Sequence, residues 1–106
     1  MSRSAIIAGP DADGLGDALE GQGVTVTRAT GTANRPALEE AGIVEADLLV
    51  LTDVGLATSI AVAKDLNPEV RVVVYVDDSL PEFAKGQADL LVDPNLLDAE
   101  TVAEEL

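Results

Sequence analysis

The sequence predicts a single α/β domain in which helices cover both faces of a parallel β-sheet. Five short apolar runs recur along the 106 residues, and three of them are almost continuous in Val, Leu or Ile, as in strands buried on both faces. Segments with helical spacing and helix-ending glycines lie between the runs. The chain length is that of one domain, so we expect residues 1–106 to form one unit.

The apolar runs are the predicted strands, and they span residues 5–9, 24–28, 47–52, 70–76 and 88–92. The second run alternates Val and Thr, which suits a more exposed strand at the edge of the sheet. A helical segment follows each run, so consecutive parallel strands are joined by crossovers. Such crossovers are right-handed and give a doubly wound, three-layer sheet.

The predicted helices span residues 14–21, 36–42, 56–66, 79–86 and 98–106. Asn34 lies where a capping residue of the second helix is expected, and Pro36 suits the first helical turn. Asp98 is the expected cap of the last helix, and Glu100 in its first turn favours the helix dipole.

The composition excludes several classes of function. Asp and Glu number 20 against 6 Lys and Arg, which gives a formal charge of −14, and there is no His or Cys. Disulfides, thiolate metal sites and imidazole bases are therefore absent, and no residue set supports an enzyme assignment. The negative charge argues against nucleic acid as a partner. No apolar run is long enough to insert into a membrane or to form a signal peptide, so we expect a cytoplasmic protein.

The acidic surface also indicates an environment. The hydrophobic fraction is 47% and the acidic residues are spread between apolar runs, which is typical of a folded chain and not of a disordered one. Few lysines and almost no aromatic residues accompany the charge of −14. High salt screens the self-repulsion of such a surface, so we expect a halophilic source. An ordinary acidic protein is the alternative.

Three segments of the sequence resemble one known family. They are residues 38–47 (LEEAGIVEAD), 61–74 (AVAKDLNPEVRVVV) and 87–97 (QADLLVDPNLL), and they are similar to passages of the N-terminal nucleotide-binding domain of K⁺-transport regulators, the TrkA-N or RCK family. The likeness is good over residues 38–106 and weaker over 5–37. It implies a Rossmann-like fold, an NAD(H) or adenine-nucleotide site, a regulatory role in potassium transport and a homodimer.

The first loop departs from the glycine-rich pattern of that family. Gly9 and Gly14 match its first and third glycines, but Asp11 stands at the second, where the backbone would approach a pyrophosphate. Arg28 ends the second strand in place of an acid that would bind ribose, and an Arg there could accept a 2′-phosphate. One αβ unit is missing before Thr32, which replaces the family's Asp. Its loss predicts five strands in the order 2-1-3-4-5.

The resemblance thus implies a ligand-binding set at the carboxyl ends of the strands. Its members are Gly9, Asp11, Gly14, Arg28, Thr32, Thr52 and Asp53. Three occupants stay open at this point. They are a dinucleotide such as NAD(H), a mononucleotide or other small ligand, and no physiological ligand at all.

Five carboxylates follow predicted strands and supply an alternative interpretation. They are Asp11, Asp13, Asp53, Asp77 and Asp78. Hard cations such as Mg²⁺ take oxygen ligands, so Asp11, Asp13 and Asp53 are candidate metal ligands. This arrangement is similar to that of the receiver domains of response regulators. By that resemblance, Asp53 would be the phosphate acceptor of this chain. Asp is also a common turn and cap residue, so such loops collect it without any site.

Two positions depart from the receiver pattern. Asp77 and Asp78 end the fourth strand, where receivers have Ser or Thr, and Asp93 precedes Pro94, where they have Lys. The favoured interpretation is therefore a non-catalytic regulatory or ligand-sensing domain of TrkA-N type. It would act through a homodimer or a protein partner, with Val102, Leu106 and residues 56–66 as contact surfaces. A receiver-like signalling domain that uses Asp53 is the alternative.

Overall fold

A parallel sheet of five strands in the order β2-β1-β3-β4-β5 forms the centre of the molecule, as the sequence predicts. The computed structural model describes residues 3–29, 31 and 33–106, so Thr32 lies outside the described residues. The strands are β1 (Ser4–Ala8), β2 (Thr25–Ala29), β3 (Leu48–Leu51), β4 (Arg71–Tyr75) and β5 (Leu90–Val92). The helices are α1 (Leu15–Gly21), α2 (Arg35–Glu40), α3 (Thr58–Leu66), α4 (Glu82–Lys85) and α5 (Ala99–Glu105), with single 3₁₀ turns at η1 (Ile43–Glu45) and η2 (Val54–Leu56).

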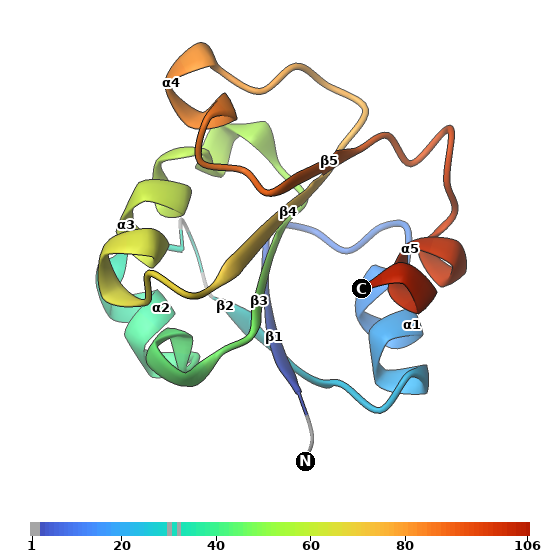
Figure 1. Cartoon of the computed structure of the whole chain (residues 1–106), viewed down its shortest axis with the longest axis horizontal. Coiled ribbons are helices and arrows are strands. Elements are labelled where there is room, and N and C mark those ends of the chain that lie inside the picture. Colours follow the sequence, from blue (N-terminus) through green and yellow to red (C-terminus); the bar gives the residue numbers. More distant parts are fainter. Residues whose placement is uncertain (1–2, 30, 32) are drawn as a thin grey trace.

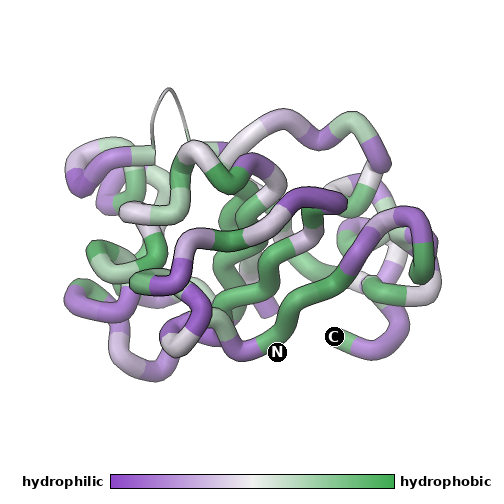
Figure 2. The backbone as a smooth tube through the Cα atoms, turned by 90° about the horizontal axis from the view of Figure 1, so that it is seen from above, coloured by the Kyte–Doolittle hydropathy of each residue, from purple (hydrophilic) through white to green (hydrophobic). Residues whose placement is uncertain are grey.

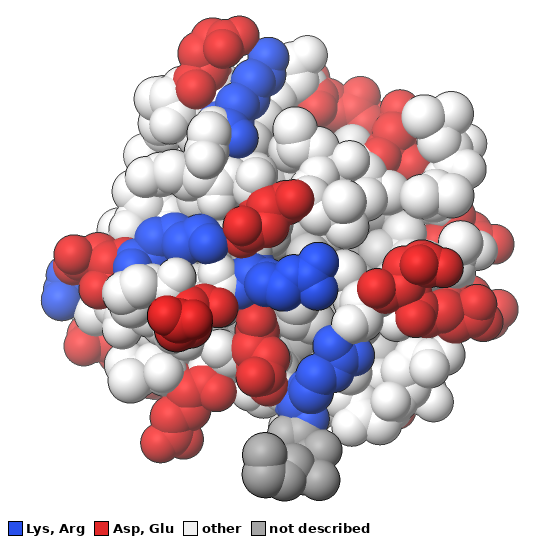
Figure 3. Space-filling model, in the orientation of Figure 1, with Lys and Arg blue, Asp and Glu red and all other residues white. Residues whose placement is uncertain are grey.

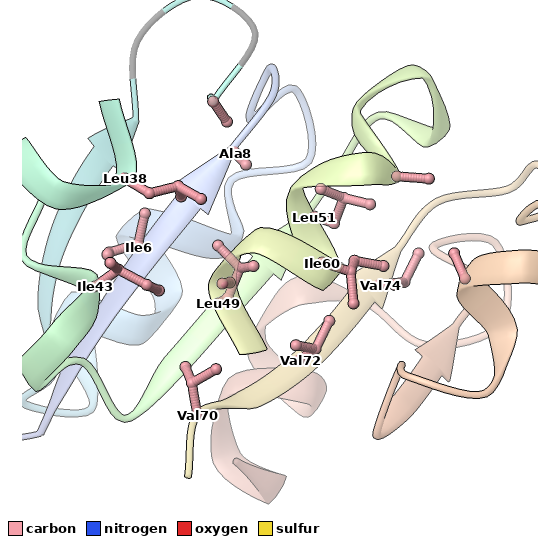
Figure 4. Close-up of a cluster of buried hydrophobic side chains, with 14 of the residues drawn as sticks. Ile6, Ala8, Leu38, Ile43, Leu49, Leu51, Ile60, Val70, Val72 and Val74 are labelled. Carbon is pink, nitrogen blue, oxygen red and sulfur yellow. The ribbon is translucent and has the colours of Figure 1, made fainter. Parts of the chain in front are cut away.

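Helices lie on both faces of this sheet, with α2, α3 and α4 on one face and α1 and α5 on the other (Figure 1). Because side chains alternate along a strand, each central strand supplies both cores. Ile6 packs with the α2 and α3 side, where Leu38, Ile43 and Ile60 point toward the strands (Figure 4). Ile7 packs with the α1 and α5 side. Figure 2 shows the resulting pattern, with hydrophobic strands inside and hydrophilic segments around them.

The predicted helix caps are confirmed. Asn34 Oδ1 accepts a hydrogen bond from the Ala37 N–H at 3.1 Å, and Asp98 Oδ1 accepts one from the Thr101 N–H at 2.8 Å. The fourth helix is shorter than predicted, because Pro81 has the extended backbone of a cap and disfavours a helical residue before it. Only the four residues of α4 are helical in this segment.

The contact surface predicted on the last helix is wrong. Val102 and Leu106 are 2% and 9% exposed, and they pack with Leu15 and Leu19 of α1 beneath the sheet. Helices α1 and α5 thus share one hydrophobic core on this face of the sheet. Their apolar side chains are therefore used inside the domain. No helix among the described residues is long and apolar enough to cross a membrane.

A hydrogen-bonded pair ties α3 to the strands where β4 and β5 begin. Lys64 Nζ donates to the Val70 carbonyl at 2.7 Å and to Asp89 Oδ2 at 2.9 Å, and Asp89 Oδ2 also accepts from the Val72 N–H at 2.7 Å. Burial alone would raise the pKa of Asp89. The hydrogen bonds from Val72 and Lys64 outweigh it, so the pKa lies below its usual value.

This lowered pKa predicts a pH-dependent stability. The Asp89 carboxylate stabilises the fold above the unfolded-state pKa near 3.8 and loses that contribution as the pH falls through the lower folded-state pKa. We expect the urea midpoint of the parent protein to exceed that of Asp89→Asn at pH 6, and the difference to shrink below about pH 4. The exposed variant Glu105→Gln controls for the loss of one negative charge. A difference that does not change with pH would contradict the prediction.

Candidate functional site

Gly9 follows β1 at the carboxyl edge of the sheet and brings the first loop against the end of β3. Its φ is +109°, and a Cβ there would lie 2.6 Å from Thr52 Oγ1 and 3.2 Å from the backbone nitrogen of Asp53. Thr52 is held at the same place, because its N–H donates to the Ala8 carbonyl at 3.0 Å and its hydroxyl to the same oxygen at 3.3 Å. Gly9 therefore serves the close approach of two strand ends.

Asp11 turns back onto the start of α1. Its carboxylate accepts hydrogen bonds from the N–H groups of Leu15 and Gly16, both at 2.9 Å, and from Arg28 Nη2 at 3.0 Å. The Asp11 side chain is only 10% exposed, whereas that of Arg28 is 51% exposed. The first N–H groups of a helix have no partner within the helix and attract negative charge. Asp11 supplies that charge from the chain itself, in the place a nucleotide phosphate would need.

Gly16 makes this arrangement possible, and the sequence interpretation gave it no role. A Cβ on Gly16 would lie 2.6 Å from Asp11 Oδ2, 2.7 Å from Arg28 Nη2 and 2.9 Å from Ile7 Cδ1. The residue is buried within the first turn of α1. Gly14, which matches the third glycine of the glycine-rich pattern, has a φ of +74°. Nothing lies within 4 Å of a Cβ there, so Gly14 is a turn residue. A second glycine at the helix start was the available signal for close packing there.

Removing the Asp11 carboxylate should destabilise α1. We expect Asp11→Ala to lower the free energy of unfolding by about 2 kcal/mol, because two helix N–H groups lose their acceptor and Arg28 loses its partner. Urea unfolding at fixed high salt measures the loss. Arg28→Ala should cost less, since that side chain is half exposed. Equal effects of the two variants would show that the ion pair, and not the cap, carries the energy.

The other predicted carboxylates do not gather around one point. Asp53 is exposed after β3, and its Oδ1 accepts a hydrogen bond from the Gly55 N–H at 2.8 Å. Asp13 instead lines a cavity of about 400 Å³ between α1 and α5. Burial is the largest cause that raises the pKa of Tyr75, and the negative charges of Asp13 and Asp98 raise it further. The Tyr75 hydroxyl donates a hydrogen bond to the Leu97 carbonyl at 2.9 Å. Across residues 3–29, 31 and 33–106, no group of three or more acidic side chains could hold a metal ion.

Asp77 and Asp78 lie beside a second cavity, of about 360 Å³, at the carboxyl ends of β4 and β5. Lys85 lines the same cavity, but its ammonium is bonded to Glu82 Oε1 at 3.0 Å. Arg28, at the end of β2, is bonded to Asp11. In the described part of the chain, no Lys or Arg forms an ion pair with Asp53. The carboxyl edge thus presents negative charge with its nearby cations already paired.

Comparison with known proteins identifies a family and a fold. A family model described as "Family of unknown function (DUF7126)" matches residues 5–106. Comparison with curated proteins gives no match. A CheY-like response regulator receiver domain protein from Methanospirillum hungatei superposes with a TM-score of 0.74 and 17% identity, covering 99% of this chain and 90% of that one. An orphan response regulator of H. pylori gives 0.73 and 16%, covering 98% and 92%.

A third response regulator structure, from Burkholderia pseudomallei, contains a phosphorylated aspartic acid, a calcium ion and citrate. It superposes with a TM-score of 0.64 and 22% identity, covering 98% of this chain and 70% of that one. The chain is therefore similar in fold to receiver domains, as the alternative interpretation of the sequence has it. At these identities the likeness concerns the fold alone.

The expected membership of the TrkA-N or RCK family is wrong. The TrkA-N domain of the inner membrane protein ybaL from Escherichia coli superposes with a TM-score of only 0.56 at 17% identity, below the receiver structures. Two of the three segments that suggested it, residues 38–47 and 61–74, lead from a helix to the next strand of the sheet. With that family, the expected NAD(H) site and the role in potassium transport lose their support, and Asp11 occupies the helix start that a nucleotide would need.

Proposed function

We propose that this chain, which belongs to DUF7126, a family of unknown function, is a receiver-like regulatory domain that acts by binding another protein, without catalysis and without phosphoryl transfer. The observation that supports the proposal is the surroundings of Asp53. This residue lies two positions after β3 on a receiver-like sheet, yet no Lys or Arg among the described residues pairs with it. A phosphoryl group adds up to two negative charges, which need cations or a metal to neutralise them.

The positions of the candidate metal ligands support the same conclusion. Asp11, the acid nearest β1 in sequence, is hydrogen-bonded to α1 and Arg28, and Asp13 lines the cavity between α1 and α5. We further infer that residues 1–106 work as one domain in the cytoplasm, as the composition suggests. The expected homodimer came from the TrkA-N resemblance and is not confirmed. The carboxyl edge carries exposed acids whose nearby cations are already paired, so we infer that the partner is a different protein with basic side chains.

The test is incubation with Mg²⁺ and a small phosphodonor such as acetyl phosphate, followed by intact mass measurement. We expect no mass increase by a phosphoryl group at any time point. The Burkholderia structure with its phosphorylated aspartic acid makes phosphorylation of Asp53 the second candidate function. A phosphoryl adduct that disappears in Asp53→Asn would establish that candidate and overturn the phosphorylation-independent proposal.

A thermal-shift series separates protein binding from nucleotide sensing. NAD(H), NADP(H), ATP, ADP and AMP, with and without Mg²⁺, should leave the melting temperature unchanged, because Asp11 fills the start of α1. A ligand at 100 times its dissociation constant would add about 2.7 kcal/mol to the free energy of unfolding, which such a series detects. A shift with any of these nucleotides would contradict the proposal.

A further inference from the structure

We infer that the second cavity, here called the β4–β5 groove, is where a partner protein docks a short segment with an apolar side chain flanked by Lys or Arg. The inference rests on the proposed function, since it names the surface and the partner chemistry through which the domain would act. The groove is lined by Val74, Val76, Asp77, Asp78, Ser79, Leu80, Lys85, Leu91, Val92, Asp93 and Leu96.

Two large apolar side chains of the groove are exposed to solvent. Leu91 of β5 and Leu96 of the following turn line the groove and are 52% and 80% exposed. Five large apolar side chains are exposed on the described chain, and two of them, Leu91 and Leu96, line this one groove, whereas the first cavity has none. Single exposed apolar residues are ordinary, but a gathering of them marks a binding surface. β5 is moreover an edge strand, paired only with β4.

Carboxylates surround the two exposed leucines of the groove. Asp77 and Asp78 follow β4, and Asp93 follows β5, so three carboxylates border the exposed leucines. Asp78 and Asp93 each use one oxygen, accepting from the N–H groups of Ser79 and Asn95. Figure 3 shows acidic side chains over the connections that leave β4 and β5, beside the paired blue and red side chains over α4.

The exposed leucines and the carboxylates around them together select the occupant. An apolar anchor fills the space beside Leu91 and Leu96, and cationic neighbours satisfy the three carboxylates. A second copy of this chain does not fit as well, because its own groove carries the same three acids and its Lys85 is already bonded to Glu82. The partner segment is therefore basic where this domain is acidic.

The first cavity provides a matched control within the same chain. It is bordered by the carboxylates of Asp13, Asp17, Glu100 and Glu104, but its other lining residues are small or polar and it has no large exposed apolar side chain. General attraction between a basic peptide and a chain of charge −14 would use both cavities. Docking by apolar anchoring plus charge uses the β4–β5 groove alone.

The experiment uses a short synthetic peptide with central leucines flanked by lysines, added to the full ¹⁵N-labelled chain at the lowest salt that keeps it folded. We expect backbone amide shifts confined to residues 74–80 and 91–96. Labelled-peptide anisotropy then measures affinity. The double variant Leu91→Ser/Leu96→Ser should weaken peptide binding roughly tenfold, and so should the double variant Asp77→Asn/Asp78→Asn. Two controls, the single variant Val44→Ser and the double variant Asp17→Asn/Glu100→Gln, should each change the affinity by less than about twofold. Circular dichroism confirms that each variant is folded.

Each alternative has its own result. Binding to a peptide with serine in place of leucine, or equal losses in the Asp17 and Glu100 variant, would show non-specific charge attraction and overturn the inference. No binding of the leucine–lysine peptide would overturn it too. A dimer in light scattering that Leu91→Ser with Leu96→Ser abolishes would make a second copy the occupant, again against the inference. The phosphodonor test on the same protein is independent, so a phosphorylated Asp53 would overturn the proposed function without touching the groove.

Discussion

Replacing Gly9 by alanine should lower the free energy of unfolding by about 3 kcal/mol or more. Two costs combine at this position. The φ of +109° is one that residues with a Cβ rarely adopt, and the new methyl group would meet Thr52 Oγ1 at 2.6 Å and the Asp53 backbone nitrogen at 3.2 Å. The backbone of β3 cannot retreat without breaking its ladder to β1, so the strain is not relieved locally.

The control for this prediction is Gly21→Ala at the end of α1. Nothing lies within 4 Å of a Cβ there and its φ is not positive, so we expect no loss and a gain of up to about 1 kcal/mol from the better helix former. Urea unfolding of both variants measures the contrast. Similar stabilities for the two variants would mean that the end of β1 is not packed as closely as these distances require.

Replacing Asn67 by alanine should cost about 2–4 kcal/mol. The residue is 9% exposed, and its Nδ2 donates to the carbonyls of Ile43 and Ala46, both at 2.9 Å. Its Oδ1 accepts from the Glu69 N–H at 3.1 Å. One amide thus connects η1, the end of α3 and the turn into β4. Alanine would leave two carbonyls without this donor, and each such loss costs about 1–3 kcal/mol.

Asn95→Ala is the matched control, because that residue is exposed and its side chain makes none of the hydrogen bonds described. We expect a change within about 0.5 kcal/mol. Asn67→Asp should be at least as damaging as Asn67→Ala, since a carboxylate would face two carbonyl oxygens. Full stability of Asn67→Asp would show that this amide is not the link between the three segments.

The spacing of apolar residues and the positions of helix-capping and turn residues were enough to predict the fold. Near-continuous apolar runs identified the buried strands, and Asn34 and Asp98 marked helix starts through an interaction local in sequence. The order 2-1-3-4-5 was also predicted correctly, although it was inferred from a resemblance to a family that the structure comparison does not support. The loss of one αβ unit from the longer Rossmann-like sheet leaves five strands in the same order that the receiver fold has.

The site was harder to predict, because it depends on contacts between residues distant in sequence. Asp11 and Arg28 are 17 positions apart, and only the folded backbone brings both onto Gly16. Sequence position alone placed Asp11 beside Asp13 and Asp53, whereas hydrogen bonds to α1 turn it away. The apolar groove was also missed. Leu91 and Leu96 look like ordinary strand and loop residues until β5 is known to be the open edge.

The arrangement of Asp11, Arg28 and Gly16 limits how the domain could evolve. A lineage that gained a phosphate ligand at the start of α1 would first have to lose the Asp11 carboxylate. That step removes the cap before any ligand compensates for it, so the intermediate protein is less stable than either its ancestor or its ligand-bound descendant. Adaptive change is therefore easier on the β4–β5 groove, where side chains are exposed and substitutions do not pass through a less stable intermediate protein.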